Sequence, residues 1–459
     1  MESTFREHLE AKLGVSPPAR ILVGFSGGAD STCLLHLLHT SGYDVVAAHL
    51  NHGMREVADA DQAACAAFAD RFGIPFLAGK ADVPKMARDL GIGIEEAGRN
   101  ARYEFFRQGA FRTECDWIAT GHTSSDNAET VLLNLVRGTG ISGLAGIPGR
   151  RENIIRPLLP FSREETEKYC CEHGFETRHD SGNDDLSFSR VRMRKNVIPE
   201  LELVHPGATK AILRLRETAE EEDRFLNGAA AAALEQSEVP LNGDLGFITA
   251  SVELAFDRAR LTSAPAVLFK RAVRLAAEAL GAGLSFDQVQ RVASAMADTG
   301  AGSITAEGGE VVCEWDATRF HFRRLDVAEP FRFPLTYPGD TDAEIFGWRI
   351  CAEPWSEVPS VLPRAALRTV IDLQKAKGNL YFRSLEPGDT MMPLGFDGTR
   401  KLSDLAGEAK LTQAARRCLP VVCDLVGPVW LPGVCVSERV RPDLASQRLA
   451  RLTFGPIEG

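Results

Sequence analysis

The chain has 459 residues, 44% of them hydrophobic and 25% charged, and a net charge of −11. This length exceeds one core of ordinary size, and the composition is that of a folded soluble protein, so we expect two to four globular domains and exclude disordered and fibrous classes. No run approaches the ~20 consecutive apolar residues of a membrane span, and the first residues are polar, which predicts a cytoplasmic protein with no membrane partner.

The first part of the chain alternates short apolar runs with helical patterns. Strand-like runs lie at 21–25, 45–50, 75–77 and 117–120, and helical patterns lie at 32–39, 59–72 and 127–136. This alternation predicts an α/β domain with a parallel sheet over residues 1–205. Ligands of such sheets bind beyond the carboxyl ends of the strands, so we expect the chemistry just after residues 25, 50 and 120.

The pattern of predicted secondary structure changes after residue 205. Long charged helical stretches such as 209–227 and 264–280 predict a helical domain over 206–325. A Pro-rich stretch over 326–379 is expected to be a connecting segment, and Gly turns with one basic helix predict a small α+β domain over 380–459.

The charge distribution and the spacing of the cysteines limit which partners and cofactors the chain is expected to bind. Residues 361–459 contain 14 Lys and Arg against 10 Asp and Glu, a net +4, whereas the first 360 residues have a net charge of −15. A basic cluster, RVRMRK, spans 190–195 and is read either as a phosphate contact or as a solvated helix face. The ten cysteines include no CxxC pair, so we expect buried free thiols and no iron–sulfur or metal site built on cysteine.

The sharpest motif is ILVGFSGGADS at 21–31, where a strand, a glycine-bearing turn and a helix start coincide. Such a turn is an anion cradle, because glycines allow close backbone approach and helix N-terminal amides point at a phosphate, while Ser26 and Ser31 add hydroxyl donors. Asp30 would repel polyphosphate unless it held a cation, which suggests Mg²⁺. A helix start without a ligand is the plainer alternative, and the Walker pattern is absent.

Charged residues also follow the later strands. Arg99 and Arg102 lie at i and i+3 of a predicted helix, where they can clamp phosphates or form surface ion pairs with neighbouring Glu residues. Asp126 and Glu129 lie one turn apart in TGHTSSDNAET at another helix start, which suits Mg²⁺ or an ammonium group better than a core. The Gly-rich stretch 137–146 could close over a nucleotide or be a plain surface loop.

These motifs together resemble the lysidine synthases, a branch of the PP-loop (N-type) ATP pyrophosphatases. The matching blocks in this order are SGGADS, HLNHGMR, EEAGRNARYEFF, ATGHTSSDNAETVLLNLVRGTGISGLAGI, RPLL and DSGNDDLSFSRVRMR. The C-terminal blocks RSLEPGD, MPLG, RKLSDL, AARRCLPVV and WLPG are also similar to that family's C-terminal domain. The family usually has two adjacent histidines after the glycine of TGH, and here the second position is Thr123.

The resemblance implies a Rossmann-like PP-loop ATPase domain and a two-step reaction. ATP is held on the loop, the C2 oxygen of the wobble cytidine in the CAU anticodon of tRNA(Ile) attacks the α-phosphate, and the ε-amine of L-lysine then expels AMP. Because lysine must lose a proton from its ε-ammonium group before it attacks, we expect a nearby carboxylate to bind the ammonium and then accept the proton.

The site residues expected on this basis fall into four groups. ATP contacts are Ser26, Gly27, Gly28, Ala29, Asp30, Ser31, His52, Arg102, Gly121 and His122. Catalytic residues are Asp30, which also holds Mg²⁺, Asp126 and Arg99. Lysine contacts are Glu96, Asp126 and Glu129, and tRNA contacts are Arg190, Arg192, Arg194, Lys195, Arg383, Lys401, Arg416 and Arg417.

Three other functions stay open on the sequence. A tRNA thiolase would need a catalytic cysteine pair, a small-molecule amidotransferase would need a glutaminase signature, and a catalytically inactive tRNA-binding protein would not need the complete SGGADS loop. The sequence leaves a homodimer as one option for the assembly.

Overall fold

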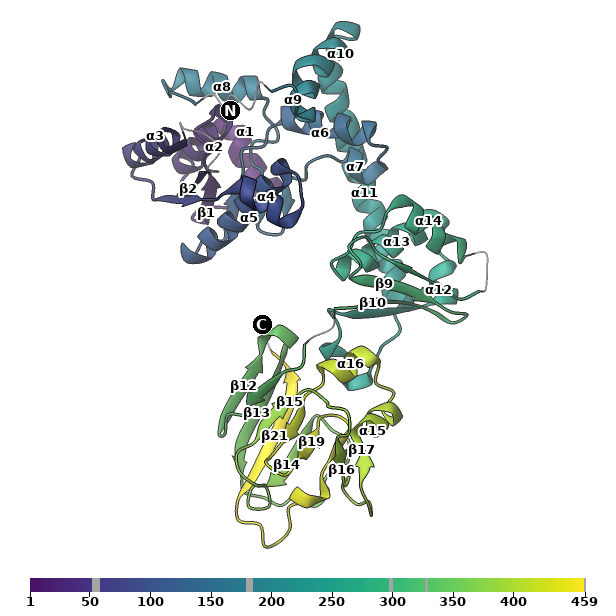
Figure 1. Ribbon diagram of the computed structural model, residues 1–459. Coiled ribbons are helices and arrows are strands. Elements are labelled where there is room, and N and C mark those ends of the chain that lie inside the picture. Colours follow the sequence, from purple (N-terminus) through teal and green to yellow (C-terminus); the bar gives the residue numbers. More distant parts are fainter. Residues whose placement is uncertain (52–57, 179–184, 297–299, 327–328, 458–459) are drawn as a thin grey trace. The chain divides into compact units, whose positions relative to one another are not determined.

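The computed structural model describes residues 1–51, 58–178, 185–296, 300–326 and 329–457 (Figure 1). These residues form two compact units, Met1–Arg224 and Phe225–Gly459. In the described ranges, no helix has the length and apolar character needed to cross a membrane.

The first unit is built on a six-stranded sheet with the strand order β3-β2-β1-β4-β6-β5. Its strands are β1 (Arg20–Gly24), β2 (Asp44–Asn51), β3 (Phe76–Lys80), β4 (Trp117–Ala119), β5 (Arg150–Arg151) and β6 (Ile154–Ile155). All neighbours pair in parallel except β5 with β6. The predicted parallel sheet is confirmed. Because β2 and β4 lie on opposite sides of β1, the carboxyl ends of β1 and β4 border the crevice where such sheets bind ligands.

Helices cover both faces of this sheet (Figure 1). The helices of this part of the chain are α1 (Glu2–Glu7), α2 (Ala29–Thr40), α3 (Ala58–Arg71), α4 (Val83–Leu90), α5 (Ile94–Arg112), α6 (Ser124–Val136), α7 (Ile141–Leu144), α8 (Arg163–Glu172), α9 (Ser189–Arg192), α10 (Ile198–Val204) and α11 (Ala208–Ser237), which begins in the first unit, with a π-helical turn η3 (Met193–Val197) after α9.

The strand residues of β1 alternate between two cores. Ile21 and Val23 pack with the buried side chains of α2, whereas Leu22 packs with Phe106 of α5. The helix α5 lies very close to β1, since a Cβ built on Gly24 would lie 2.6 Å from the Phe106 ring. Both faces are therefore sealed, and the open edge that remains for ligands is the row of strand ends.

The second unit begins with an α/β layer that the sequence reading described only as helical. Helices α12 (Arg258–Thr262), α13 (Ala266–Ala279) and α14 (Phe286–Ser294) accompany an antiparallel sheet in the order β7-β10-β9-β8. Its strands are β7 (Glu253–Asp257), β8 (Gly302–Thr305), β9 (Val311–Trp315) and β10 (Arg319–Arg324). The core holds Phe269, Phe320 and Phe322, all fully buried.

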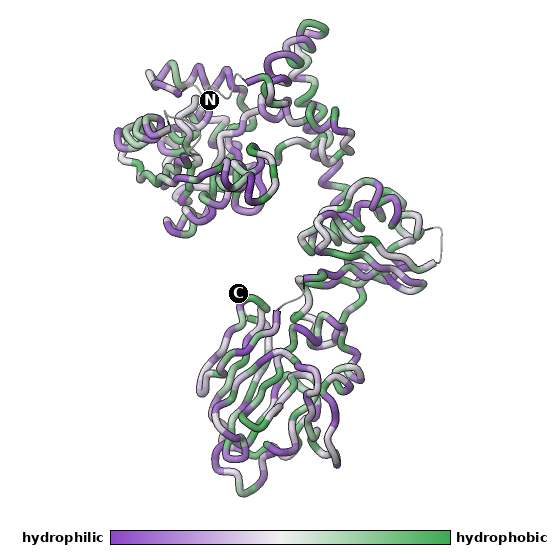
Figure 2. Tube along the Cα trace, viewed as in Figure 1, coloured by the Kyte–Doolittle hydropathy of each residue, from purple (hydrophilic) through white to green (hydrophobic). Residues whose placement is uncertain are grey.

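The remaining strands form two further sheets, in the orders β11-β15-β18-β19-β20 and β12-β13-β21-β14, and a short pair β16-β17. Their bounds are β11 (Arg332–Pro334), β12 (Gly339–Ala343), β13 (Trp348–Trp355), β14 (Arg368–Asp372), β15 (Tyr381–Arg383), β16 (Thr390–Met391), β17 (Arg400–Lys401), β18 (Val421–Cys423), β19 (Pro428–Leu431), β20 (Cys435–Val436) and β21 (Leu449–Pro456), with helices α15 (Leu402–Glu408) and α16 (Gln413–Cys418). Hydrophobic and hydrophilic residues alternate along many of these strands (Figure 2).

The stretch 326–379 differs from the expected connecting segment. It supplies β11 to β14, which pair with β15 and with β21 at the end of the chain. Its prolines fall near strand ends, on the edge strand β11 or in the loop between β13 and β14, where a missing N–H is tolerated, so a Pro-rich sequence here is compatible with sheet structure. The C-terminal fold therefore begins near residue 331, about fifty residues earlier than expected.

Candidate active site

The predicted anion loop joins β1 to α2 at the sheet edge. Gly27 has φ +81°, a left-handed conformation that favours glycine, and a Cβ there would lie 3.0 Å from the Cys65 sulfur. The hydroxyls of Ser26 and Ser31 lie 3.1 Å apart, and Ser31 donates to the Gly28 carbonyl at 3.0 Å. Among the described residues no side chain caps the start of α2. Its first N–H groups are therefore left for a ligand, as an anion cradle requires.

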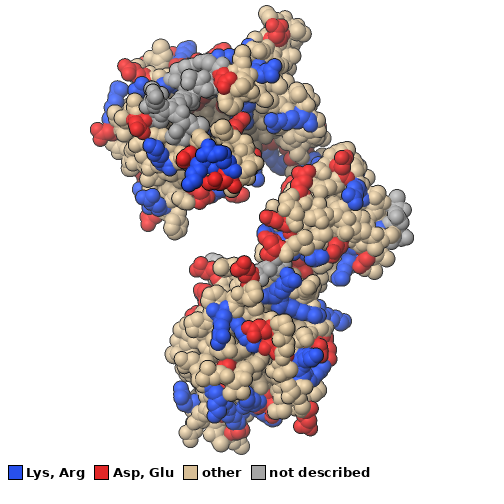
Figure 3. Space-filling model, viewed as in Figure 1, with Lys and Arg blue, Asp and Glu red and all other residues tan. Residues whose placement is uncertain are grey.

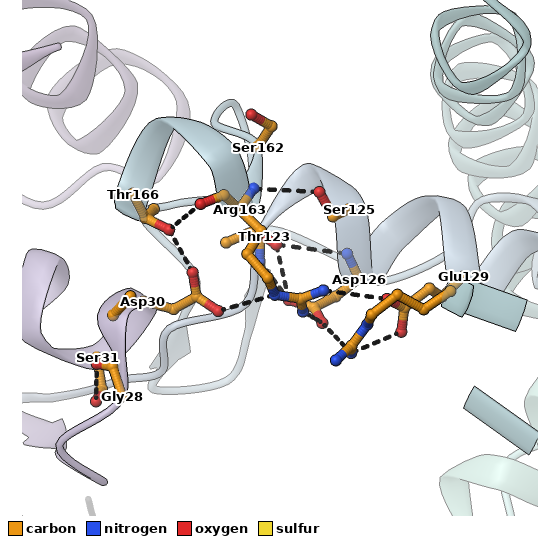
Figure 4. Close-up of polar contacts among 12 residues, drawn as sticks. Gly28, Asp30, Ser31, Thr123, Ser125, Asp126, Glu129, Ser162, Arg163 and Thr166 are labelled. Atoms are coloured by element: carbon orange, nitrogen blue, oxygen red, sulfur yellow. Dashed lines mark hydrogen bonds and ion pairs between the residues drawn. The ribbon is translucent and has the colours of Figure 1, made fainter. Parts of the chain in front are cut away.

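Three carboxylates surround one guanidinium beside this loop (Figure 4). Arg163, the first residue of α8, lies 2.8 Å from Asp126, 3.4 Å from Glu129 and 3.5 Å from Asp30. Arg194 approaches from η3, with its Nε 2.6 Å from Glu129. The structure thus brings the predicted Asp30, Asp126 and Glu129 together, and with all groups ionised the five side chains have a net charge of −1.

Asp126 is held rigidly by the start of its own helix. Thr123 is the N-cap of α6, and its backbone N–H and hydroxyl both donate to Asp126 Oδ2, at 2.8 and 2.9 Å. The Asp126 N–H lies 3.4 Å from the Thr123 hydroxyl, completing a capping box. Thr123 is fully buried. Thr123 therefore orients the Asp126 carboxylate.

The carboxylates of the cluster differ in proton affinity. Burial raises the pKa of Asp30 above its usual value, although the Thr166 hydroxyl and Arg163 act in the other direction. Burial also opposes ionisation of Asp126, but Arg163 and the Thr123 donors outweigh it and hold that pKa below its usual value. The Asp126 carboxylate is thus firmly ionised, whereas Asp30 is the more basic of the two.

A cavity of about 510 Å³ gathers another part of the predicted set. Its lining includes Arg99, Arg102 and His122, which were all expected at the site, together with Arg190 of the basic cluster. Burial lowers the pKa of His122 to about 4, with Arg156, Arg190 and Arg99 acting in the same direction. His122 is therefore neutral near pH 7, and its Nδ1 lies 2.9 Å from the Thr120 hydroxyl.

Gly121 links this cavity to the anion loop. A Cβ on Gly121 would lie 3.2 Å from both the Asp30 carbonyl carbon and the Ser31 nitrogen, so the strand end after β4 packs directly on the start of α2. The next residue, His122, lines the cavity. The loop, the carboxylate cluster and the arginine-lined cavity are thus neighbours along one sheet edge.

Several expected residues lie elsewhere. His52 falls outside the described residues. Glu96 is exposed on α5 and makes no ion pair with any described residue, so the structure does not bring it to the cluster. Arg192 and Lys195 are exposed, whereas Arg194 of the same cluster is committed to Glu129 and is poorly placed for the tRNA contact expected of it.

Of the tRNA contacts expected in the second unit, some side chains are exposed and others are engaged within the protein. Arg383 is buried and donates two hydrogen bonds to Asp389, at 2.6 and 2.8 Å, so it stabilises the turn between β15 and β16 and is a poor phosphate ligand. Arg416 is half-buried and donates to the Leu411 carbonyl, while Lys401 and Arg417 are exposed. Figure 3 shows Lys and Arg side chains interspersed with Asp and Glu on one face of this part of the chain.

Sequence reasoning missed Arg163 and Thr166. The start of their helix is readable, because Ser162 and Glu165 form a capping box. The contacts of Arg163 cannot be predicted from the sequence, because Asp126 and Asp30 lie 37 and 133 positions away along the chain.

This fold and site define a PP-loop ATP-binding protein, and residues 1–201 match the family model described as a PP-loop domain. The chain belongs to the tRNA(Ile)-lysidine synthase family. It is 32% identical to the tRNA(Ile)-lysidine synthase of Symbiobacterium thermophilum, covering 98% of this chain and 96% of that one, and 33% identical to that of Solibacter usitatus, covering 90% and 92%. Among solved structures, the U34-tRNA thiolase NcsA from Methanococcus maripaludis aligns with 20% identity and a TM-score of 0.41, covering 48% of this chain and 78% of that one.

Proposed function

We propose that this chain joins L-lysine to the wobble cytidine in the CAU anticodon of tRNA(Ile). ATP adenylates the C2 oxygen with release of pyrophosphate, and the ε-amine of lysine then displaces AMP to form lysidine. Family membership supports the reaction class. The observation that carries the proposal is the carboxylate cluster beside the anion loop, because it pairs an ATP site with a site for a cationic second substrate.

The anion loop acts in the first step. The N–H groups at the start of α2 and the hydroxyls of Ser26 and Ser31 bind the phosphates of ATP, and they stabilise charge that develops as pyrophosphate leaves. Asp30 lies one residue inside α2, so its carboxylate is close to those phosphates.

Mg²⁺ fits this arrangement as a partner of ATP. Within the described ranges no group of three or more acidic, His or Cys side chains could hold a metal ion alone. In nucleotide sites, however, Mg²⁺ takes one or two carboxylates with phosphate oxygens and water, and Asp30 would supply one. The ion would neutralise phosphate charge. Thr166 positions the Asp30 carboxylate by donating a hydrogen bond to it.

The carboxylate cluster acts in the second step. Its net charge of −1 attracts one more cation, and the ε-ammonium of lysine matches it in size and charge. Asp126 is ionised and pre-oriented by Thr123, so it suits binding of the ammonium. The amine must lose a proton before it attacks C2, and a carboxylate of the cluster accepts that proton.

The cysteines near the loop favour lysine over sulfur chemistry. Cys65 packs against Gly27, and burial raises its pKa to about 12. Cys170 donates to the Ala29 carbonyl at 3.4 Å, and burial raises its pKa to about 11. Both are therefore thiols near pH 7, whereas sulfur transfer needs a thiolate.

The test is incubation of the full chain with ATP, Mg²⁺, labelled lysine and a tRNA(Ile) transcript carrying the CAU anticodon. We expect one lysine per tRNA, with AMP and pyrophosphate formed in equal amounts. Incorporation of sulfur instead of lysine, or no tRNA-dependent release of pyrophosphate, would reject the proposal.

The variant Asp30→Ala tests whether Asp30 is needed for the first step, the adenylation of the tRNA. It should abolish tRNA-dependent pyrophosphate release, because the carboxylate proposed to hold Mg²⁺ is lost. Thr166→Val is the matched control, since it removes only the hydroxyl that donates to Asp30. Normal pyrophosphate release by Asp30→Ala would exclude a metal role for this residue.

A further inference from the structure

The Gly-rich stretch 137–146 ends in a turn that borders the candidate active site. Gly146 and Ile147 line the cavity of about 510 Å³ that also contains His122. Gly146 has φ +67°, and a Cβ there would overlap the side-chain oxygen of Asn127, so both the backbone angle and the available space favour glycine. The turn therefore forms part of the cavity wall, in close contact with α6.

Helix α6 holds this turn from one side through Asn127, which is buried. The Asn127 Oδ1 accepts a hydrogen bond from the Ile147 N–H at 2.7 Å, and its Nδ2 donates to the Ile147 carbonyl at 3.5 Å. Asn127 directly follows Asp126 of the carboxylate cluster in α6. The position of the turn is therefore joined to the helix that presents this carboxylate.

Arg216 of α11 holds the same turn from the other side. Its Nε donates to the Ala145 carbonyl at 3.1 Å, and its Nη2 donates to the Ile147 carbonyl at 3.4 Å. The side chain is 13% exposed, and Glu220, one helical turn further along α11, lies 2.8 Å from it. Because a guanidinium presents its donors in a fixed planar fork, Arg216 fixes the two carbonyls relative to each other.

A second contact attaches α11 to the Gly-rich stretch. Ser142 of α7 donates to the Asp223 Oδ1 at 2.6 Å. Arg216 and Asp223 are two helical turns apart, so α11 contacts the stretch at two points separated by about 10 Å along the helix axis. The same helix continues beyond the first unit, which ends at Arg224, into the second unit. One wall of the cavity is thus attached to the helix that joins the two units.

We propose that Arg216 is a positioning residue for the reaction, with Asp223 as a second anchor. Arg216 acts through the turn 145–147, whose backbone it holds against Asn127 and hence against the helix of the carboxylate cluster. Loss of Arg216 should therefore slow the chemical steps, which depend on the relative placement of the reacting groups. It should leave ATP affinity unchanged, because the phosphates are proposed to bind at loop 26–31. The inference rests on the proposed function for the reaction that is measured.

The main variant is Arg216→Met, which removes the guanidinium and keeps an unbranched side chain. Glu220 then still has Arg224 at 3.8 Å and is not left as an isolated charge. Asp223→Ala removes the acceptor for Ser142, whereas Asp223→Asn keeps an oxygen that can accept the same hydrogen bond. Arg214→Met is the matched control, because Arg214 is an exposed arginine of the same helix.

The readouts are kcat, the KM for ATP, thermal melting and hydrogen–deuterium exchange of the amides of residues 143–149. In Arg216→Met we expect kcat to fall about tenfold or more with the KM for ATP within about twofold, as a loss of positioning requires. Exchange of these amides should accelerate at least about tenfold, because the turn opens more often. Asp223→Ala should lower kcat about threefold, while Asp223→Asn and Arg214→Met should match the parent chain.

Three results would overturn the inference. A normal kcat with only a lower melting temperature would give Arg216 a purely structural role. Unchanged amide exchange would show that Arg216 does not hold the turn, and a raised KM for ATP at normal kcat would place its effect at the nucleotide loop. If exchange accelerated in Arg216→Met and not in Arg214→Met, but the parent chain joined no lysine to tRNA, the proposed function would fail and the hold of Arg216 on the turn would stand.

Discussion

Arg163 is the residue on which the two halves of the site depend. It contacts Asp30 of the anion loop and Asp126 and Glu129 of α6, and these carboxylates hold its pKa above the usual value despite the opposing effect of burial. It also keeps the acids from repelling one another, because it lies between them (Figure 4).

Replacement of Arg163 by Gln should separate lysine binding from catalysis. The cluster would change from a net −1 to a net −2, so the KM for lysine should fall, while kcat should fall at least about tenfold because the carboxylates lose their fixed positions. We also expect a loss of about 3 kcal/mol in unfolding free energy, since a partner of buried carboxylates is removed.

Steady-state kinetics in lysine and urea unfolding measure these effects for Arg163→Gln. Arg163→Lys keeps the charge and serves as the control, with a KM for lysine near that of the parent chain. A raised KM for lysine in Arg163→Gln would contradict the assigned role.

The residues of the site were predictable where local spacing encodes them. The glycines and serines of the loop, and the pair Asp126 and Glu129 one helical turn apart, follow from a strand end or a helix start. The N-cap role of Thr123 was not predicted, although Thr is a residue type that N-caps favour. The ion pairs that neutralise the carboxylates join segments distant along the chain, and no periodicity reports such contacts.

At the scale of elements, the packing of α2 against α8 positions the anion loop. His36 of α2 is buried, its Nδ1 lies 2.8 Å from the Tyr169 hydroxyl of α8, and its ring contacts those of His173 and Phe175. Burial, with His173 and His39 contributing, lowers the pKa of His36 to about 4.

This contact predicts a loss of stability in acid. In the unfolded chain His36 takes up a proton near its usual pKa of about 6.5, whereas in the folded protein it stays neutral down to about pH 4. Stability from this residue is thus complete above pH 6.5 and declines as the pH falls toward 4, by about 3 kcal/mol.

Urea unfolding followed by the fluorescence of Trp117 in the first unit should show this decline between pH 7 and 4. The variant His36→Gln cannot titrate and should show a flatter pH dependence. An equal decline in both proteins would contradict the assignment to His36.

The elements missed by the sequence reading have a physical reason in common. The stretch RFHFRR of β10 alternates apolar and polar residues as a strand should, but the long charged helical stretches earlier in 206–325 outweighed this six-residue signal. The prolines between 332 and 372 led to the expectation of a connecting segment. The residues there form strands instead, because partners distant in the sequence complete their sheets.

At the scale of the whole molecule, the last strand limits how the tRNA-binding role of the C-terminal region can be tested. The strand β21 pairs with β13 on one side and β14 on the other, and it contributes the buried Leu452 and Phe454 to the core. Deletion of 380–459 would remove it and expose the core of the second unit, so point variants are the better tools.

The double variant Lys401→Gln and Arg417→Gln should weaken tRNA binding several-fold and leave the Kd for ATP unchanged. Both side chains are exposed, and contacts of this kind bind phosphates without reading sequence. Arg349→Gln is the control, because Arg349 is neutralised by Asp342 at 2.6 Å. Filter binding with full-length tRNA at two salt concentrations measures the effect, and equal affinity of the double variant and the parent chain would remove these residues from the tRNA surface.

The absence of a side chain at Gly121 allows close packing between the strand end after β4 and the anion loop. In-line attack needs the reacting atoms within about 3–3.5 Å, and misplacement by about 1 Å costs on the order of a hundredfold in rate. At 121 a methyl group would meet the backbone of Asp30 and Ser31 at 3.2 Å, closer than such groups normally lie. A methyl group there would move the start of α2 by a few tenths of an ångström, so glycine at 121 lets the strand end after β4 pack directly on the anion loop.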